Sequence, residues 1–176
     1  PYTDKRWPTQ IRRHTLMSLS RLEYSGDKHG DVFDTLYPLL SLADYEDLVR
    51  HAVAVLMKIK PRRGVQDKIR HLVEENRHTG VRAYALQALS RLSSITNAEL
   101  ALTYLHHHEA SLRDAAALAL QQMPDAPTVI LRHLDEVKDR SKAFEMVRIL
   151  ESHDKRIKPD KARGMIKHML ELYEAN

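Results

Sequence analysis

The densest group of chemically versatile side chains in this chain is the run His106-His107-His108-Glu109. Imidazoles and carboxylates are the nitrogen and oxygen ligands of zinc sites. Adjacent side chains on a helix diverge by about 100°, however, so three consecutive histidines cannot all bind one ion from a regular helix. We expect the run at the C-terminal end of a helix, where imidazolium suits the helix dipole. The run therefore favours a polar turn over a metal site.

A second set, His71, Glu75 and His78, has the spacing i, i+4 and i+7, which places all three on one face of a helix. It includes a single E-x-x-H motif, whereas di-iron helical bundles need two such motifs and two further glutamates. The chain has no cysteine, no glycine-rich phosphate loop and no G-x-S-x-G motif. We therefore expect no enzymatic activity, no metal and no other cofactor.

Helices must position these residues, because strand-like alternation is missing and good helix formers dominate the composition. No apolar run approaches the roughly 20 residues that span a bilayer, and no signal peptide is visible, so we expect a cytoplasmic protein without direct membrane insertion. The sequence predicts an all-α chain. The expected helices are 8–24, 31–42, 45–60, 64–77, 80–93, 97–107, 109–122, 126–136, 139–152 and 159–174.

An apolar residue followed by arginine recurs near the start of four expected helices, at intervals of 31 to 38 residues. Small and large aliphatic residues follow each pair at helical spacing, and the alanines let neighbouring helices approach closely. Self-similarity at this period is typical of solenoids, whose units bury their apolar faces against one another. The four pairs are Ile11-Arg12, Val49-Arg50, Val81-Arg82 and Leu112-Arg113.

The stretches VRAYALQAL, beginning at Val81, and LRDAAALAL, beginning at Leu112, resemble the second helix of HEAT repeats. The likeness is greatest to the short repeats related to the phycobilin-lyase type. It covers residues 44–123 well, 1–43 in part and 124–176 by helix rhythm only. The resemblance implies a right-handed α-solenoid of about five helix pairs. It implies little about activity: the HEAT-like enzyme deoxyhypusine hydroxylase uses several His-Glu pairs, and here His108-Glu109 is the sole pair.

In HEAT families the arginine of the motif tends to join a ladder of Asp-Arg contacts between repeats. An arginine at the start of a helix opposes the helix dipole, so it should have such a partner. Asp47 and Glu109 stand just before Arg50 and Arg113 and could serve. Arg82 has no equivalent acid.

The resemblance further implies that the second helices line a concave surface, on which three columns of residues recur. The last column is basic in three repeats, with Arg21, Lys58 and Arg91, and then neutral at Gln122. This groove could hold an acidic protein partner or, alternatively, a nucleic-acid phosphate backbone; ordinary solvated surface is the third interpretation. The candidate binding residues are His14, Arg21, His51, Lys58, Tyr84, Gln87 and Arg91. Met17, Ala54 and Leu118 complete the middle column, and Ala115 completes the first.

Residues 1–176 are expected to form one repeat domain that is a piece of a longer protein. The repeat phase makes the chain begin on a second helix and end on an unpaired first helix. The apolar residues of helix 159–174 would then lie on an uncapped terminal face, and we expect end-to-end self-association. These residues are Met165, Ile166, Met169, Leu170 and Tyr173.

Overall fold

The computed structural model describes residues 9–21, 30–41, 46–58, 64–92, 94–153 and 159–174. All regular structure in these ranges is helical, so the predicted all-α class is confirmed. None of the helices described is both long and apolar enough to cross a membrane. The α-helices are α1 (Thr9–Arg21), α2 (Gly30–Leu36), α3 (Glu46–Leu56), α4 (Val65–Glu75), α5 (Thr79–Leu89), α6 (Ile95–Tyr104), α7 (Ala110–Gln122), α8 (Ala126–Leu134), α9 (Arg140–Glu151) and α10 (Pro159–Glu174), and a 3-10 helix, η1 (Tyr37–Ser41), follows α2.

Each expected helix has a counterpart, but several end at other residues than predicted. Two of these ends have a clear backbone cause. The expected helix 31–42 gives way to η1 at Tyr37. Pro38 has no N–H to donate and its ring would clash with the carbonyl four residues earlier, which ends an α-helix. The expected helix 64–77 ends earlier, because Asn76 is extended, with φ −71° and ψ 134°.

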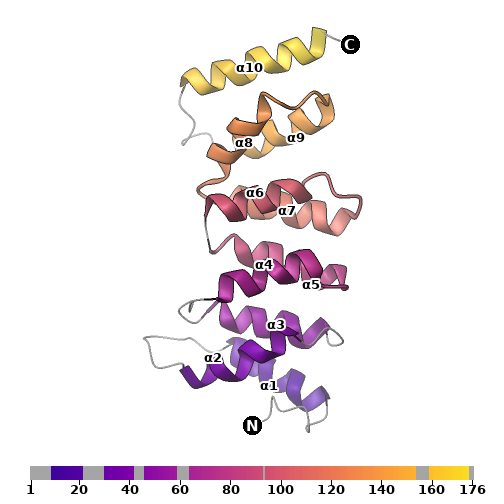
Figure 1. Ribbon diagram of the computed structural model, residues 1–176, viewed down its shortest axis with the longest axis vertical. Coiled ribbons are helices and arrows are strands. Elements are labelled where there is room, and N and C mark those ends of the chain that lie inside the picture. The colour runs from indigo at the N-terminus through magenta and orange to yellow at the C-terminus, as the bar shows by residue number, and fades with distance from the viewer. Residues whose placement is uncertain are drawn as a thin grey trace. The chain divides into compact units, whose positions relative to one another are not determined.

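The chain divides into two compact units, residues 1–92 and 93–176. In unit 1, α3 packs against both α1 and α5, α4 packs against α5, and η1 contacts α3 and α4 (Figure 1). The N-terminal ends of α1, α3 and α5 lie together, since Arg13 reaches Asp47 at 3.5 Å and Glu46 reaches His78 at 4.0 Å. The core contains fully buried leucines and alanines, among them Leu16, Leu40, Leu48, Ala52, Leu56, Ala85, Leu86 and Leu89.

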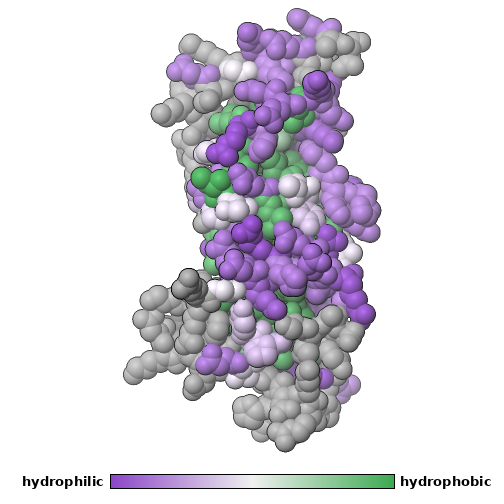
Figure 2. Space-filling view, viewed as in Figure 1, coloured by the Kyte–Doolittle hydropathy of each residue, from purple (hydrophilic) through white to green (hydrophobic). Residues whose placement is uncertain are grey.

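In unit 2, α6 packs against α7 and α8, α9 packs against α7 and α8, and α10 contacts α8 and α9. Small residues allow this close packing: Ala101, Ala116 and Ala119 are wholly buried beside Leu112 and Leu120. Figure 2 shows that the visible face of the described residues is mostly hydrophilic, with apolar side chains showing in places.

In two of the four copies of the repeated motif, the arginine binds backbone carbonyls at the end of the preceding helix. Arg82 Nε donates to the Val73 carbonyl at 2.8 Å, and Arg113 Nη1 donates to the carbonyls of His107 and His108, both at 2.8 Å. These carbonyls follow or belong to the last turn of a helix, where they lack intrahelical partners. The expectation that Glu109 would partner Arg113 is therefore wrong.

The expected ladder of acids and arginines is present in part, with different partners. Asp47 pairs with Arg13 of α1, whereas Arg50 lies 3.9 Å from Glu46, one turn earlier on its own helix. In the first copy of the motif, the arginine is buried rather than the apolar residue before it. Ile11 is 38% exposed and Arg12 is 4% exposed. Arg12 and Leu16 are separated by one helical turn and face the core together, which rotates Ile11 outward.

Candidate functional site

Five of the seven predicted binding residues lie on the helices α1, α3 and α5 of unit 1, and the other two directly follow α3 and α5. These three helices are neighbours, and their N-terminal ends lie together. Three of these residues are basic and stand at the opposite, C-terminal ends: Arg21 ends α1, Lys58 lies two residues past α3, and Arg91 lies two residues past α5. All three are exposed. We call them the basic column. A cation at a helix C-terminus is favoured by the helix dipole, so each position also stabilises its own helix.

The basic column places one positive charge at the C-terminal end of each of three helices that pack in succession, α1 on α3 and α3 on α5. Within the ranges that the structure describes, the guanidinium groups of Arg21 and Arg91 form no ion pair, whereas Lys58 has a contact. His14 and Gln87 are exposed on the same helices. The arrangement therefore presents hydrogen-bond donors and positive charge on three adjacent helices.

The two remaining predicted residues are half-buried and already have contacts. The Nδ1–H of His51 donates to the Asp47 carbonyl at 2.6 Å, one turn earlier in α3. The ring of Tyr84 lies under the guanidinium of Arg50, 5.5 Å from the ring centroid. The predicted first column does not extend to Ala115, which is only 1% exposed. An alanine in the tight α6–α7 contact is part of the core, so this part of the expectation is wrong.

The N-terminal ends of α3 and α5 meet at the carboxylate of Glu46. It lies 3.9 Å from Arg50 Nη1 and 4.0 Å from His78 Nδ1. It also occupies the space beside Gly80 that a Cβ would fill. The side chain of the N-cap residue His78 makes no capping hydrogen bond to the first turn of α5. The Glu46 carboxylate thus supplies the negative charge that a helix N-terminus favours.

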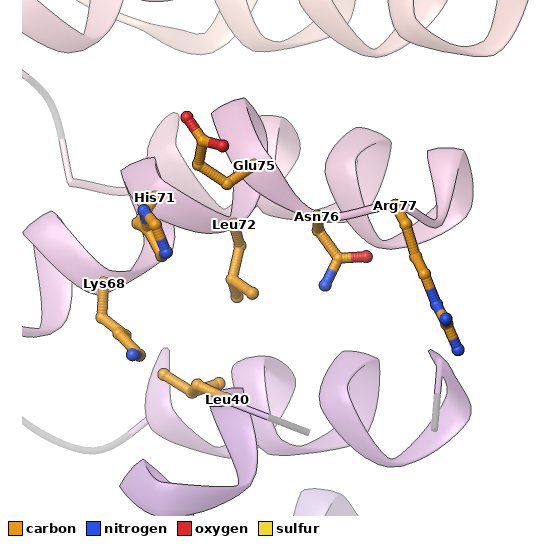
Figure 3. A pocket seen from close by; sticks show the side chains of 7 residues that line it. All are labelled: Leu40, Lys68, His71, Leu72, Glu75, Asn76 and Arg77. Atoms are coloured by element: carbon orange, nitrogen blue, oxygen red, sulfur yellow. The ribbon is translucent and has the colours of Figure 1, made fainter. Parts of the chain in front are cut away.

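A pocket of about 320 Å³ lies beside α4 and η1. In Figure 3, Lys68 and Arg77 lie at its two ends, with Leu40 and Leu72 between them. The pocket brings His71 and Glu75 together. His78 is not part of it, because α4 ends at Glu75 and His78 instead begins α5, so the predicted three-residue face does not form. Among the residues described, no three histidine or acidic side chains are arranged to hold a metal ion.

The histidine run follows α6, as predicted from its position in the sequence. His106 Nδ1 lies 3.1 Å from Glu145 Oε2 in α9. Burial lowers the pKa of His106 below 6.5, against the opposing effect of Glu145, so the imidazole tends to stay neutral. In that state Nδ1 carries the proton and donates to the carboxylate. His107 stacks against Tyr104 and accepts a hydrogen bond from the Glu109 N–H.

The second cavity, of about 290 Å³, lies between α7 and α9, and sequence reasoning missed it. It combines two arginines with two acids and a glutamine over an apolar base. The repeat pattern placed Leu118 on the surface but did not indicate that α9 would approach it. The lining residues are Leu105, Arg113, Asp114, Ala117, Leu118, Gln121, Glu145, Arg148 and Ile149.

Comparison of the chain with protein-family models, curated proteins and solved structures gives no match.

Proposed function

We propose that this chain is a HEAT-like α-solenoid and acts as a non-catalytic interaction module in the cytoplasm, an accessory domain of a larger protein that binds an acidic protein partner. The observation that carries the proposal is the basic column of Arg21, Lys58 and Arg91 on three adjacent helices. A scaffold of repeated helices offers extended surfaces and needs no catalytic constellation.

The packing order within each unit supports a repeat architecture. In unit 1, α1, α3 and α5 are successive neighbours, and in unit 2, α7 packs against α9 while α6 packs against α8. Contacts between helices two apart in the sequence are those that a stack of helix pairs makes. The motif arginines Arg82 and Arg113 also play the same role in their respective units.

The typical distance between packed helices indicates what kind of acidic partner would fit the basic column. An α-helix rises 1.5 Å per residue, so carboxylates seven residues apart lie about 10 Å apart on one face. That distance matches the roughly 8–10 Å between neighbouring helices in the column. A partner helix lying across α1, α3 and α5 would therefore place one acid against each cation.

A designed helical peptide with three glutamates at seven-residue spacing tests the proposal. We expect binding to the wild-type chain that weakens at least tenfold when Arg21, Lys58 and Arg91 are replaced by glutamine. The matched control replaces Lys138, Lys142 and Lys167, which are exposed in unit 2, and removes the same charge. Equal binding of a peptide whose glutamates are irregularly spaced would contradict the proposed register.

Nucleic-acid binding is the second candidate, because the same basic column could contact phosphates. The covering of Tyr84 by Arg50 disfavours it, since a ring in that contact is a poor platform for stacking a base. Oligonucleotide binding measured across a salt series separates the two candidates. Affinity for DNA or RNA with a steep salt slope that disappears in the triple glutamine variant would favour the nucleic acid.

Self-association through α10 is a further proposal about partners. Leu170 is 55% exposed and Tyr173 is 63% exposed, although Arg140 lies 4.5 Å over the Tyr173 ring. The side chains of Met165, Ile166 and Met169 lie outside the described residues. Sedimentation at several concentrations tests the proposal, and Leu170→Glu with Tyr173→Glu should shift any oligomer toward the monomer. A strictly monomeric wild-type chain would contradict it.

A further inference from the structure

Two arginines and two acids line the cavity between α7 and α9. Within the described part of the chain, neither Arg113 nor Arg148 pairs with Asp114 or Glu145, although all four residues line the same space of about 290 Å³. Both arginines and both acids are therefore available to a ligand that enters this space. A ligand with both a negative and a positive group would satisfy both pairs.

Arg113 is held in a fixed position before any ligand arrives. Its Nη1 donates to the carbonyls of His107 and His108, at 2.8 Å each, so both hydrogens of that nitrogen are used. The Nε and Nη2 hydrogens remain, and the edge between them is the one that binds a carboxylate in bidentate fashion. Because backbone carbonyls orient the group without neutralising it, Arg113 keeps its positive charge and loses little entropy on binding.

Glu145 is likewise held in place by a neutral partner. His106 Nδ1 lies 3.1 Å from its Oε2 and leaves the other carboxylate oxygen for a ligand. Asp114 is exposed and forms no ion pair in the described ranges. A ligand that carried a carboxylate alone would pair with the arginines but leave both acids without a partner. A ligand that also carried an ammonium group would pair with the acids as well.

Apolar side chains complete the cavity. Leu118 is 42% exposed, and Ala117 and Ile149 lie beside it in the lining. The Gln121 amide adds a donor and an acceptor. The volume lies at the lower limit of small-molecule pockets, which run from roughly 300 Å³ upward. A ligand of a few heavy atoms with a short aliphatic part fits these dimensions.

We propose that the cavity between α7 and α9 binds a small zwitterion of the free amino-acid class. Arg113 and Arg148 receive the carboxylate, Asp114 and Glu145 receive the ammonium group, and Leu118 contacts an aliphatic side chain. The site lies within unit 2 and does not depend on the basic column of unit 1. Its success or failure is therefore independent of the proposed interaction with an acidic partner.

The test uses three ligands of nearly equal size in NMR titrations of the full chain. Leucine carries both charges, 4-methylpentanoate only the carboxylate, and 3-methylbutylamine only the amine. We expect leucine to shift the amide signals of α7 and α9 and to bind at least tenfold more tightly than either single-charge analogue, about 1.4 kcal/mol per lost partner. Failure of leucine to bind at 10 mM, or equal affinity for all three ligands, would overturn the proposal.

Two substitutions on exposed positions assign the roles. Arg148→Gln should weaken leucine about tenfold, whereas Asp114→Asn should weaken leucine but tighten 4-methylpentanoate, because a repulsive charge is removed. A nonspecific charge effect would tighten 4-methylpentanoate in Asp114→Asn but leave the net-neutral leucine unchanged, and that outcome would refute the assignment. Lys138→Gln, also exposed in unit 2, controls for net charge. The triple glutamine variant of the basic column should bind leucine normally.

Discussion

Replacing Gly80 by alanine gives a quantitative test of how α3 packs on α5. In the first turn of a helix, alanine is favoured over glycine by roughly 0.5–1 kcal/mol. A Cβ at position 80, however, would collide with the Glu46 carboxylate. Glu46 must then leave the N-terminal end of α5 and its neighbours Arg50 and His78. Those exposed contacts and the dipole interaction are together worth about 0.3–1 kcal/mol.

The two terms nearly cancel, so Gly80→Ala should leave the free energy of unfolding almost unchanged. In a Glu46→Ala background the collision disappears, and the same substitution should stabilise the chain by the full 0.5–1 kcal/mol or so. The coupling energy of this double-mutant cycle is therefore expected to be about 0.5–1 kcal/mol. A gain of that size corresponds to roughly 1–4 °C in Tm for a chain of this length.

Thermal and urea unfolding, followed by circular dichroism, measures all four corners of the cycle. Gly164 in α10 is the matched control, because a Cβ there meets no atom within 4 Å. Gly164→Ala should stabilise the chain by a similar amount whether or not Glu46 is present. If Gly80→Ala stabilised the wild-type chain as much as Gly164→Ala does, Glu46 would not lie against α5 as described.

Three further predictions concern single positions. Gly64→Ala should lower the free energy of unfolding by about 1–2 kcal/mol, because Gly64 has φ 90° and residues with a side chain disfavour that region. Urea unfolding measures this loss, and an unchanged free energy of unfolding would contradict the turn geometry. Arg82→Met should lower the free energy of unfolding by about 1.5–3 kcal/mol, because it removes a charged hydrogen bond to the Val73 carbonyl. Arg91 is exposed, so the control Arg91→Met should change the free energy of unfolding by less than about 0.5 kcal/mol. The folded pKa of His106 lies below the unfolded value of 6.5, so the unfolded chain takes up this proton first and stability should fall as pH drops below about 6.5. His106→Gln should flatten that part of the stability profile, and identical profiles would show that the buried imidazole is not responsible.

The sequence predicts the helices well because their signals are local. Apolar periodicity, turn residues and good helix formers place all the expected helices. At two of the helix ends that differ from the prediction, a single backbone property decides: Pro38 converts the end of one helix into η1, and the extended Asn76 ends α4. That second difference removes His78 from the face of His71 and Glu75. A spacing rule holds only as long as the helix that carries it continues.

The candidate site was predictable only in part, because exposure depends on contacts between helices. The C-terminal positions of α1, α3 and α5 are exposed as expected. Ala115 is buried instead, since small residues are equally suited to a surface and to a tight helix contact. The cavity between α7 and α9 could not be derived from either helix alone. It requires the packing of α9 on α7 and the carbonyls that orient Arg113.

Two of the repeated arginines stabilise the fold, and one of them also lines a cavity. Arg82 and Arg113 donate hydrogen bonds to carbonyls at the end of the preceding helix, and the apolar residue before each is buried. In these two copies the motif is thus explained by helix pairing, without any ligand. Arg113 differs from Arg82 in one respect, because it also lines a cavity with Arg148 opposite acids. A structural arginine that is oriented by neutral carbonyls retains its charge, and the approach of α9 then makes that charge available to a ligand.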